Sequence, residues 1–103
     1  MLHHELSGPK GAPVLVLAHS LGTNLALWDP QLPALAERFR VLRYDARGHG
    51  RSEGTQGPYT IEGLAREVLE LLRGLEIERA HFCGLSIGGL VGMWLGAHAP
   101  QSI

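Results

Sequence analysis

A serine flanked by glycines is the feature of this sequence with the clearest chemical meaning. The run GLSIGG at residues 84–89 fits the pattern Gly-x-Ser-x-Gly, in which a serine on a sharp strand-to-helix turn acts as a nucleophile. Residues 80–85 have the character of a strand, and residues 87–99 have that of a helix stopped by Pro100. The sequence therefore predicts that Ser86 is a catalytic nucleophile.

The glycines around Ser86 support this prediction. A serine in so tight a turn adopts a strained backbone, which Gly84 and Gly88 permit, while Gly89 lets the helix pack close to the sheet. The turn would hold the hydroxyl above a helix N-terminus, whose free N–H groups and dipole stabilise a developing oxyanion. The alternative is that Ser86 only caps the helix.

The loop after the first apolar run is a candidate oxyanion loop. Its first residues, HSLG at 19–22, directly follow the apolar residues 14–18, whose strand is expected beside the strand that leads to Ser86. A serine hydrolase needs two backbone donors for the oxyanion, and we predict the N–H groups of Leu21 and Ile87. His19 is expected to order the loop by hydrogen bonding instead of acting as the base.

A second dense cluster, YDARGHGRS, occupies residues 44–52. Asp45, His49 and Ser52 could be read as a catalytic triad, but residues so close together in a glycine-rich turn rarely converge in that way. We favour a rigid turn, in which Asp45 and Arg47 satisfy buried backbone groups and each other.

Alternating apolar runs and helical patterns predict the fold class. Residues 14–18, 41–44 and 80–85 have the apolar character of buried parallel strands, and residues 2–7 are expected to form an antiparallel edge strand. Helical patterns lie between these strands. The order predicts an α/β fold with a mostly parallel sheet and flanking helices.

Two helices between the strands have recognisable ends. Asp29 is expected to cap a helix with Pro30 at its first position, and Thr60 to cap a longer one that ends at Gly74 as the C′ residue. The expected apolar face of the first helix consists of Leu32, Leu35, Ala36 and Phe39.

The composition excludes several other classes. A chain of 103 residues with a net charge of −1 forms at most one domain and gives no reason to expect nucleic acid or a membrane as partner. Cys83 is expected to be a small core residue of its strand, and the lack of a signal-peptide pattern favours the cytoplasm. The histidines have no metal-ligand spacing and there is no glycine-rich phosphate motif, so we expect neither a metal nor a cofactor.

Beyond these motifs, the sequence resembles the 3-oxoadipate enol-lactonases, α/β-hydrolases of aromatic catabolism. The segments that carry the resemblance are HSLGT at 19–23 with Trp28-Asp29, then residues 39–50, 84–95 and 98–101. The resemblance implies hydrolysis of a small-molecule substrate, 3-oxoadipate enol-lactone, to 3-oxoadipate without a cofactor. It also implies that Ser86 is the nucleophile and that Leu21 and Ile87 donate to the oxyanion.

The position of Ser86 near the end of the sequence departs from this family. In these hydrolases the acid and the histidine of the triad both follow the nucleophile, beyond a cap domain. The residues after Ser86 include no Asp or Glu, and His98 lies twelve positions along the helix, roughly 15–18 Å away. We therefore expect residues 1–103 to be an incomplete α/β-hydrolase core, truncated before the cap and the C-terminal strands, and inactive alone.

Two other functions stay open. The complete enzyme could be a carboxylesterase or a C–C bond hydrolase, because the missing cap would select the substrate. The chain could also be a non-catalytic fragment, or a subunit that pairs with a separate chain carrying the acid and histidine. Haloalkane dehalogenases and epoxide hydrolases are disfavoured, since they need Asp in place of Ser86.

Overall fold

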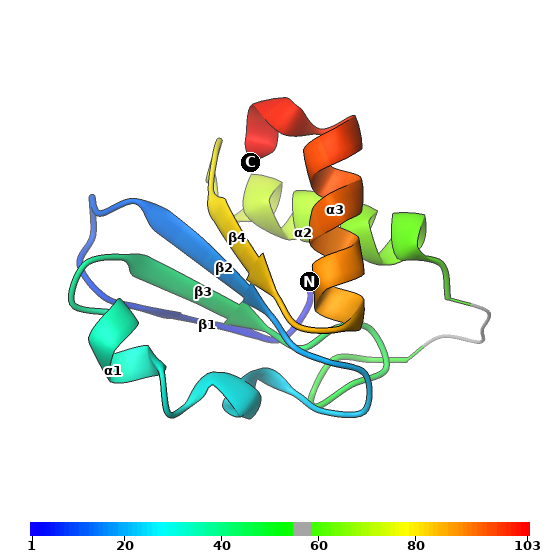
Figure 1. The fold of residues 1–103 in the computed structure, drawn as a ribbon, viewed down its shortest axis with the longest axis horizontal. Helices are drawn as coiled ribbons and strands as arrows, with labels where there is room; N and C mark the ends of the chain where they lie inside the picture. Colours follow the sequence, from blue (N-terminus) through cyan, green and yellow to red (C-terminus); the bar gives the residue numbers. More distant parts are fainter. Residues whose placement is uncertain (55–58) are drawn as a thin grey trace.

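A four-stranded sheet forms the centre of the computed structural model, which describes residues 1–54 and 59–103 (Figure 1). Its strands are β1 (His4–Ser7), β2 (Val14–Ala18), β3 (Arg40–Tyr44) and β4 (His81–Gly84), in the order β1-β3-β2-β4. The strand β2 runs parallel to β3 and β4, whereas β1 pairs antiparallel with β3. The predictions of a mostly parallel sheet, of an antiparallel edge strand and of the neighbouring β2 and β4 are therefore confirmed.

Helices cover both faces of the sheet. On one face, α2 (Ile61–Gly74) and α3 (Ile87–His98) pack over alternate strand residues such as Val16 and Leu42. Because side chains alternate along a strand, Arg43 points to the opposite face, where it contacts the short helix η1 (Leu25–Trp28). The helices α1 (Leu32–Leu35) and η2 (Pro100–Ser102) complete the fold.

The prediction of a helix capped by Asp29, with Pro30 at its first position, is wrong in both the start and the length of the helix. Asp29 is the residue that ends η1, and its carboxylate binds Arg43 instead of capping a helix. The single turn of α1 starts after Gln31, whose side chain makes no capping bond, and contains Pro33. A long-range ion pair has therefore overridden a local capping signal.

The ends of α2 confirm one prediction and correct another. Thr60 Oγ1 accepts a hydrogen bond of 2.9 Å from the Gly63 N–H, as expected of an N-cap. At the other end Gly74 is still helical, and Glu76 adopts the left-handed conformation with φ 58°. The Ile77 N–H then donates to the Leu72 carbonyl at 2.8 Å, so Glu76 is the C′ residue of a Schellman motif.

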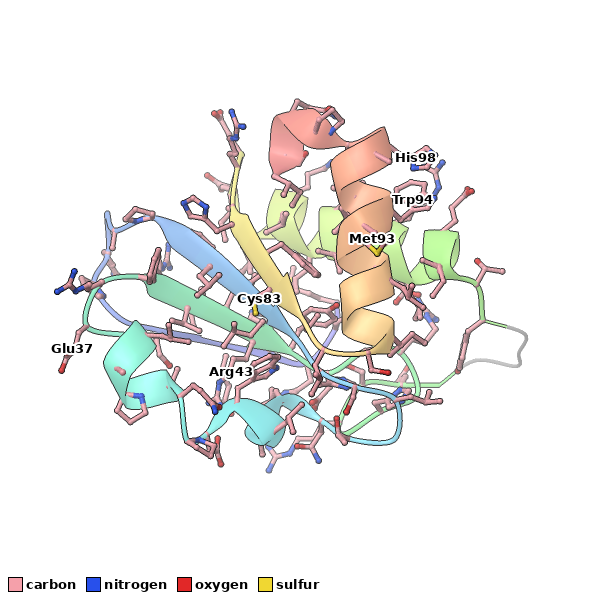
Figure 2. All side chains as sticks on the ribbon, viewed as in Figure 1. Glu37, Arg43, Cys83, Met93, Trp94 and His98 are labelled. Carbon is pink, nitrogen blue, oxygen red and sulfur yellow. The ribbon has the colours of Figure 1, made fainter. Side chains whose placement is uncertain are left out.

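Cys83 is exposed, which corrects the expectation that it is a core residue. The strand β4 lies at the edge of the sheet, and Phe82 on its inner face packs into the core with α3. Cys83 points to the other face (Figure 2), where its side chain is exposed.

The parallel strands bring three loops to one edge. The carboxyl ends of β2, β3 and β4 lead into His19, Asp45 and Leu85, so the three predicted functional segments emerge side by side. Within the described part of the chain, no helix is long and apolar enough to cross a membrane.

Candidate active site

Ser86 stands on a strained turn between β4 and α3. Its backbone has φ 57° and ψ −118°, outside the regions that residues with a side chain ordinarily occupy. The Leu85 N–H donates to the Ala18 carbonyl at 3.0 Å, and the Gly88 N–H donates back to the Leu85 carbonyl at 3.0 Å. These bonds fasten the turn to β2 and reverse the chain within a few residues, as the sequence predicted.

The Ser86 hydroxyl makes no capping hydrogen bond to α3, and the residue is exposed. Ser86 therefore does not fit the alternative interpretation of a simple helix cap. Among the residues that the structure describes, neither the Ile87 N–H nor the Leu21 N–H is hydrogen-bonded. Ser86 thus offers a free hydroxyl beside a free N–H group at the start of a helix.

Two of the three glycines are required by close approach. A Cβ at Gly84 would lie 2.3 Å from the carbonyl carbon of Gly88, and one at Gly88 would lie 2.4 Å from the Ala18 oxygen. At Gly89 the nearest atom, the Gly84 oxygen, would be 3.4 Å from a Cβ, close to ordinary contact. Gly84 and Gly88 therefore let the turn rest directly on β2, and Gly89 is under less constraint.

His19 orders the loop after β2. The residue is buried, its Nδ1–H donates to the Ser20 carbonyl at 2.8 Å, and its Nε2 accepts the Ala46 N–H at 2.9 Å. Because an N–H can only donate, Nε2 carries no proton and the ring is neutral. Burial lowers the pKa of His19 and keeps it in this form. The predicted role in hydrogen bonding is confirmed, and neither ring nitrogen is free to act as a base.

The loop between His19 and η1 closes on itself. Thr23 donates to the Ser20 carbonyl both from its hydroxyl, at 2.8 Å, and from its N–H, at 3.2 Å. Leu21 lies at the tip of this turn with 66% of its surface exposed. The Leu21 N–H is therefore in a short, closed loop at the same edge of the sheet as Ser86.

The turn after β3 is a structural cluster, and no triad forms in it. Asp45 accepts the N–H groups of Leu25 and Arg51 at 2.8 and 2.9 Å, as expected for a carboxylate that satisfies buried backbone. Ser52 Oγ donates to the main-chain oxygen of Asp45, and His49 Nδ1 contacts the Arg47 carbonyl at 3.1 Å. Asp45, His49 and Ser52 are therefore each engaged with the backbone.

The predicted pairing of Arg47 with Asp45 is wrong. Its Nε binds Glu67 of α2 at 2.6 Å, and no contact with Asp45 is found in the described residues. The hydrogen bond to Glu67 raises the pKa of the Arg47 guanidinium. Arg47 thus connects the turn after β3 to the helix layer.

The role of Arg43 was not predicted from the sequence. This buried arginine binds Glu5 at 2.8 Å and Asp29 at 2.6 Å, and it donates to the Leu25 carbonyl at 3.2 Å. A charged residue inside an apolar strand was the available signal, because such a residue needs partners when buried.

The last histidine is far from Ser86. His98 stacks on Trp94, with ring centroids 4.4 Å apart, near the end of α3 opposite the Ser86 turn (Figure 2). In the described ranges no histidine or carboxylate bonds the Ser86 hydroxyl, and no group of three potential metal ligands is found. Residues 1–54 and 59–103 therefore hold the Ser86 turn without an acid and base directed at it.

The sheet, the crossovers and the serine turn define an α/β-hydrolase. The family model for the alpha/beta hydrolase fold matches residues 13–103, and the chain belongs to this family. It is 46% identical to 3-oxoadipate enol-lactonase 1 of Acinetobacter baylyi, covering 91% of this chain and 35% of that protein. It is also 47% identical to the putative carbamate hydrolase RutD of Stutzerimonas stutzeri, over 97% of this chain and 39% of the relative.

A solved structure shows the same similarity. The enol-lactonase from Burkholderia xenovorans superposes with a TM-score of 0.97 and 54% sequence identity, covering 99% of this chain and 40% of that one. The chain thus spans well under half the length of the proteins that it matches. The resemblance to the enol-lactonases is confirmed, and the similarity lies in a part of these proteins only.

Proposed function

We propose that Ser86 is the nucleophile of a carboxylic ester hydrolase that opens 3-oxoadipate enol-lactone to 3-oxoadipate. The observation that carries the proposal is the exposed Ser86 hydroxyl, which no capping bond occupies, on a backbone of φ 57° at the start of α3. A strained residue costs on the order of 1–3 kcal/mol and is characteristic of functional sites. The similarity to enol-lactonases in sequence and in structure supports this substrate.

The proposed reaction passes through an acyl-enzyme. Ser86 Oγ attacks the lactone carbonyl while a histidine takes its proton, and the N–H groups of Leu21 and Ile87 stabilise the oxyanion. The ring C–O bond then breaks and the histidine protonates the leaving enol oxygen. Water, deprotonated by the same histidine, attacks the ester, frees Ser86 and leaves the product as its enol, which tautomerises to the ketone.

We further propose that residues 1–103 are an incomplete core, and that the acid and the histidine lie in chain outside them. Both nitrogens of His19 are engaged, and His98 lies at the opposite end of α3. The relatives contain more than half of their length beyond the matched region. The chain by itself is therefore expected to be nearly inactive, because removal of the base alone can lower kcat by on the order of a million-fold.

A chimera tests this proposal. Residues 1–103 replace the matching part of the Acinetobacter baylyi enol-lactonase, so that the relative supplies the remaining chain. We expect hydrolysis of the enol-lactone, loss of at least about 10⁴-fold in kcat on S86A, and labelling of Ser86 by a serine-directed phosphonate. The isolated chain should neither turn over nor be labelled. A folded chimera in which S86A is as active as its parent would refute the role of Ser86.

A carbamate is the second candidate substrate. The identity of 47% to the putative carbamate hydrolase RutD is close to the 46% to enol-lactonase 1, which makes a carbamate a candidate, whereas the 54% identity to the enol-lactonase structure favours the lactone. The same Ser86 turn would serve either carbonyl, and the remaining chain would select between them. Because the chimera borrows an enol-lactonase remainder, the fair comparison is a second chimera with the Stutzerimonas stutzeri remainder, assayed on both substrates.

A further inference from the structure

The loop that carries Leu21, residues 19–25, is held at both ends by two consecutive residues, Asp45 and Ala46. At its start, His19 Nε2 accepts the Ala46 N–H at 2.9 Å. At its end, the Leu25 N–H donates to Asp45 Oδ1 at 2.8 Å. Asp45 and Ala46 directly follow β3, so the loop position is tied to the central part of the sheet.

The Asp45 carboxylate is itself firmly placed. Asp45 is only 2% exposed, and its second oxygen accepts the Arg51 N–H at 2.9 Å. A Cβ at Gly50 would lie 2.2 Å from Asp45 Oδ2, so the turn after β3 closes tightly around the carboxylate. A buried carboxylate is stable only with such partners, and its two oxygens join two separate loops.

The backbone of Leu25 is held from a second direction. Its carbonyl accepts a hydrogen bond of 3.2 Å from Arg43, which is anchored to Glu5 of β1 and to Asp29. Both polar groups of the Leu25 backbone thus bind side chains of β3 or of the residue that follows it. Figure 2 shows Arg43 between the sheet and the η1 segment.

We infer that Asp45 is a positioning residue for the oxyanion site, one that sets where the Leu21 N–H lies relative to Ser86. The inference rests on the proposed function, in which Leu21 donates to the oxyanion. Oxyanion donors act over a narrow range of about 2.7–3.1 Å, so a small shift of the loop reduces stabilisation of the transition state. Asp45 does not touch the reacting atoms and acts through the backbone of Leu25.

The substitution D45N tests this role in the chimeric enzyme. Asparagine keeps the shape, but its amide oxygen can accept only one of the two N–H groups while its NH₂ group faces the other. We expect kcat to fall by about 10- to 100-fold, with KM within about threefold, because the lost interaction forms in the transition state. The matched control is E37Q, the same change from carboxylate to amide at an exposed residue just after α1 that lies outside this network.

A thionoester substrate separates positioning from a general loss of folding. Sulfur fits an oxyanion site poorly, so an intact site favours the oxygen ester over its thiono analogue. D45N is expected to reduce this preference, whereas E37Q should leave it unchanged. A smaller fraction of folded enzyme would lower both rates equally and would not alter their ratio.

Amide hydrogen exchange gives a readout that does not need activity. In D45N, the hydrogen-bonded amides of Thr23 and Leu25 should exchange at least about tenfold faster than in the parent, while those of α3 remain protected. A chimera without Ser86-dependent hydrolysis would overturn the proposed function. A chimera that works through Ser86, but whose D45N variant matches E37Q in kcat, ester preference or loop exchange, would overturn only this inference.

Discussion

Two glycine-rich turns at the same edge of the sheet use their serines in opposite ways. In the turn after β3, Ser52 Oγ donates to the Asp45 main-chain oxygen and accepts the His3 N–H at 2.9 Å. In the turn after β4, the hydroxyl of Ser86 makes no capping bond and its backbone is strained at φ 57°. Similar composition thus produces one turn saturated with hydrogen bonds and one that leaves its serine available.

The difference follows from what surrounds each serine. The turn after β3 wraps around a buried carboxylate, whose need for donors draws in backbone groups. The turn after β4 is instead fixed by backbone packing, with Gly84 against Gly88 and Gly88 against Ala18. The Ser86 side chain contributes nothing to holding its own turn, so it is free for chemistry.

The largest expected effect is the contrast between S86A and S52A in the chimeric enzyme. S86A should lose at least about 10⁴-fold in kcat while the free energy of unfolding changes by less than about 0.5 kcal/mol. S52A should keep its kcat and lose about 1–2 kcal/mol of stability, because two hydrogen bonds are removed. Kinetics and urea unfolding on both variants measure this, and an S52A variant that loses kcat while fully folded would break the comparison.

The next largest effect concerns the glycines of the Ser86 turn. G88A should cost about 3 kcal/mol or more, since its Cβ would meet the backbone of β2, which cannot move aside as a side chain can. The matched control is G96A in the same helix, where nothing lies within 4 Å of a Cβ. Because alanine has a higher helix propensity than glycine, G96A should raise the free energy of unfolding by at most about 1 kcal/mol. Equal unfolding midpoints for the two variants would show that the turn is not held by close packing.

Much of this contrast could be predicted because its signals are local. The strand and helix around Ser86, the glycines at fixed offsets and the capping of α2 by Thr60 each depend on residues a few positions apart. His19 could also be interpreted correctly, since a histidine at a strand end is commonly engaged by loop backbone. The parallel sheet followed from the order of the apolar runs.

The wrong predictions concern residues whose position depends on partners far away in the sequence. Asp29 binds Arg43 instead of capping a helix, and Arg47 binds Glu67 of α2 instead of Asp45. Cys83 is exposed because β4 lies at the edge of the sheet, which no window of sequence around it reveals. Glu76 takes the left-handed position expected of Gly74, since the chain must turn where Ile77 packs against the core.

A smaller effect tests the strain at Ser86 directly. Glycine adopts φ 57° without a steric cost, so S86G should raise the free energy of unfolding by about 1 kcal/mol while abolishing activity. The control is E76G, at the other non-glycine residue with positive φ, 58°. It should gain a similar amount of stability and leave kcat unchanged, as measured by urea unfolding and lactone hydrolysis. If S86G is less stable than the parent, the Ser86 turn is not a site of strain.

The smallest expected effect is a dependence of stability on pH that originates at His19. Burial lowers its pKa below 6.5, opposed by the Ser20 carbonyl and Asp45 and reinforced by His49. Well above pH 6.5 the ring is neutral in both states, and its effect on stability is constant. As the pH falls below 6.5 the unfolded chain takes up the proton first, so stability decreases, by at most about 1.4 kcal/mol per pH unit.

Urea unfolding between pH 7 and 5.5 measures this loss, and H19Q should diminish it. Glutamine can accept the Ala46 N–H through its amide oxygen without a titrating ring, so the bond between the two loops is preserved. H98Q, at an exposed histidine, should retain the loss seen in the parent. If H19Q and the parent lose stability equally in this range, protonation of His19 is not the cause of the loss of stability at acidic pH.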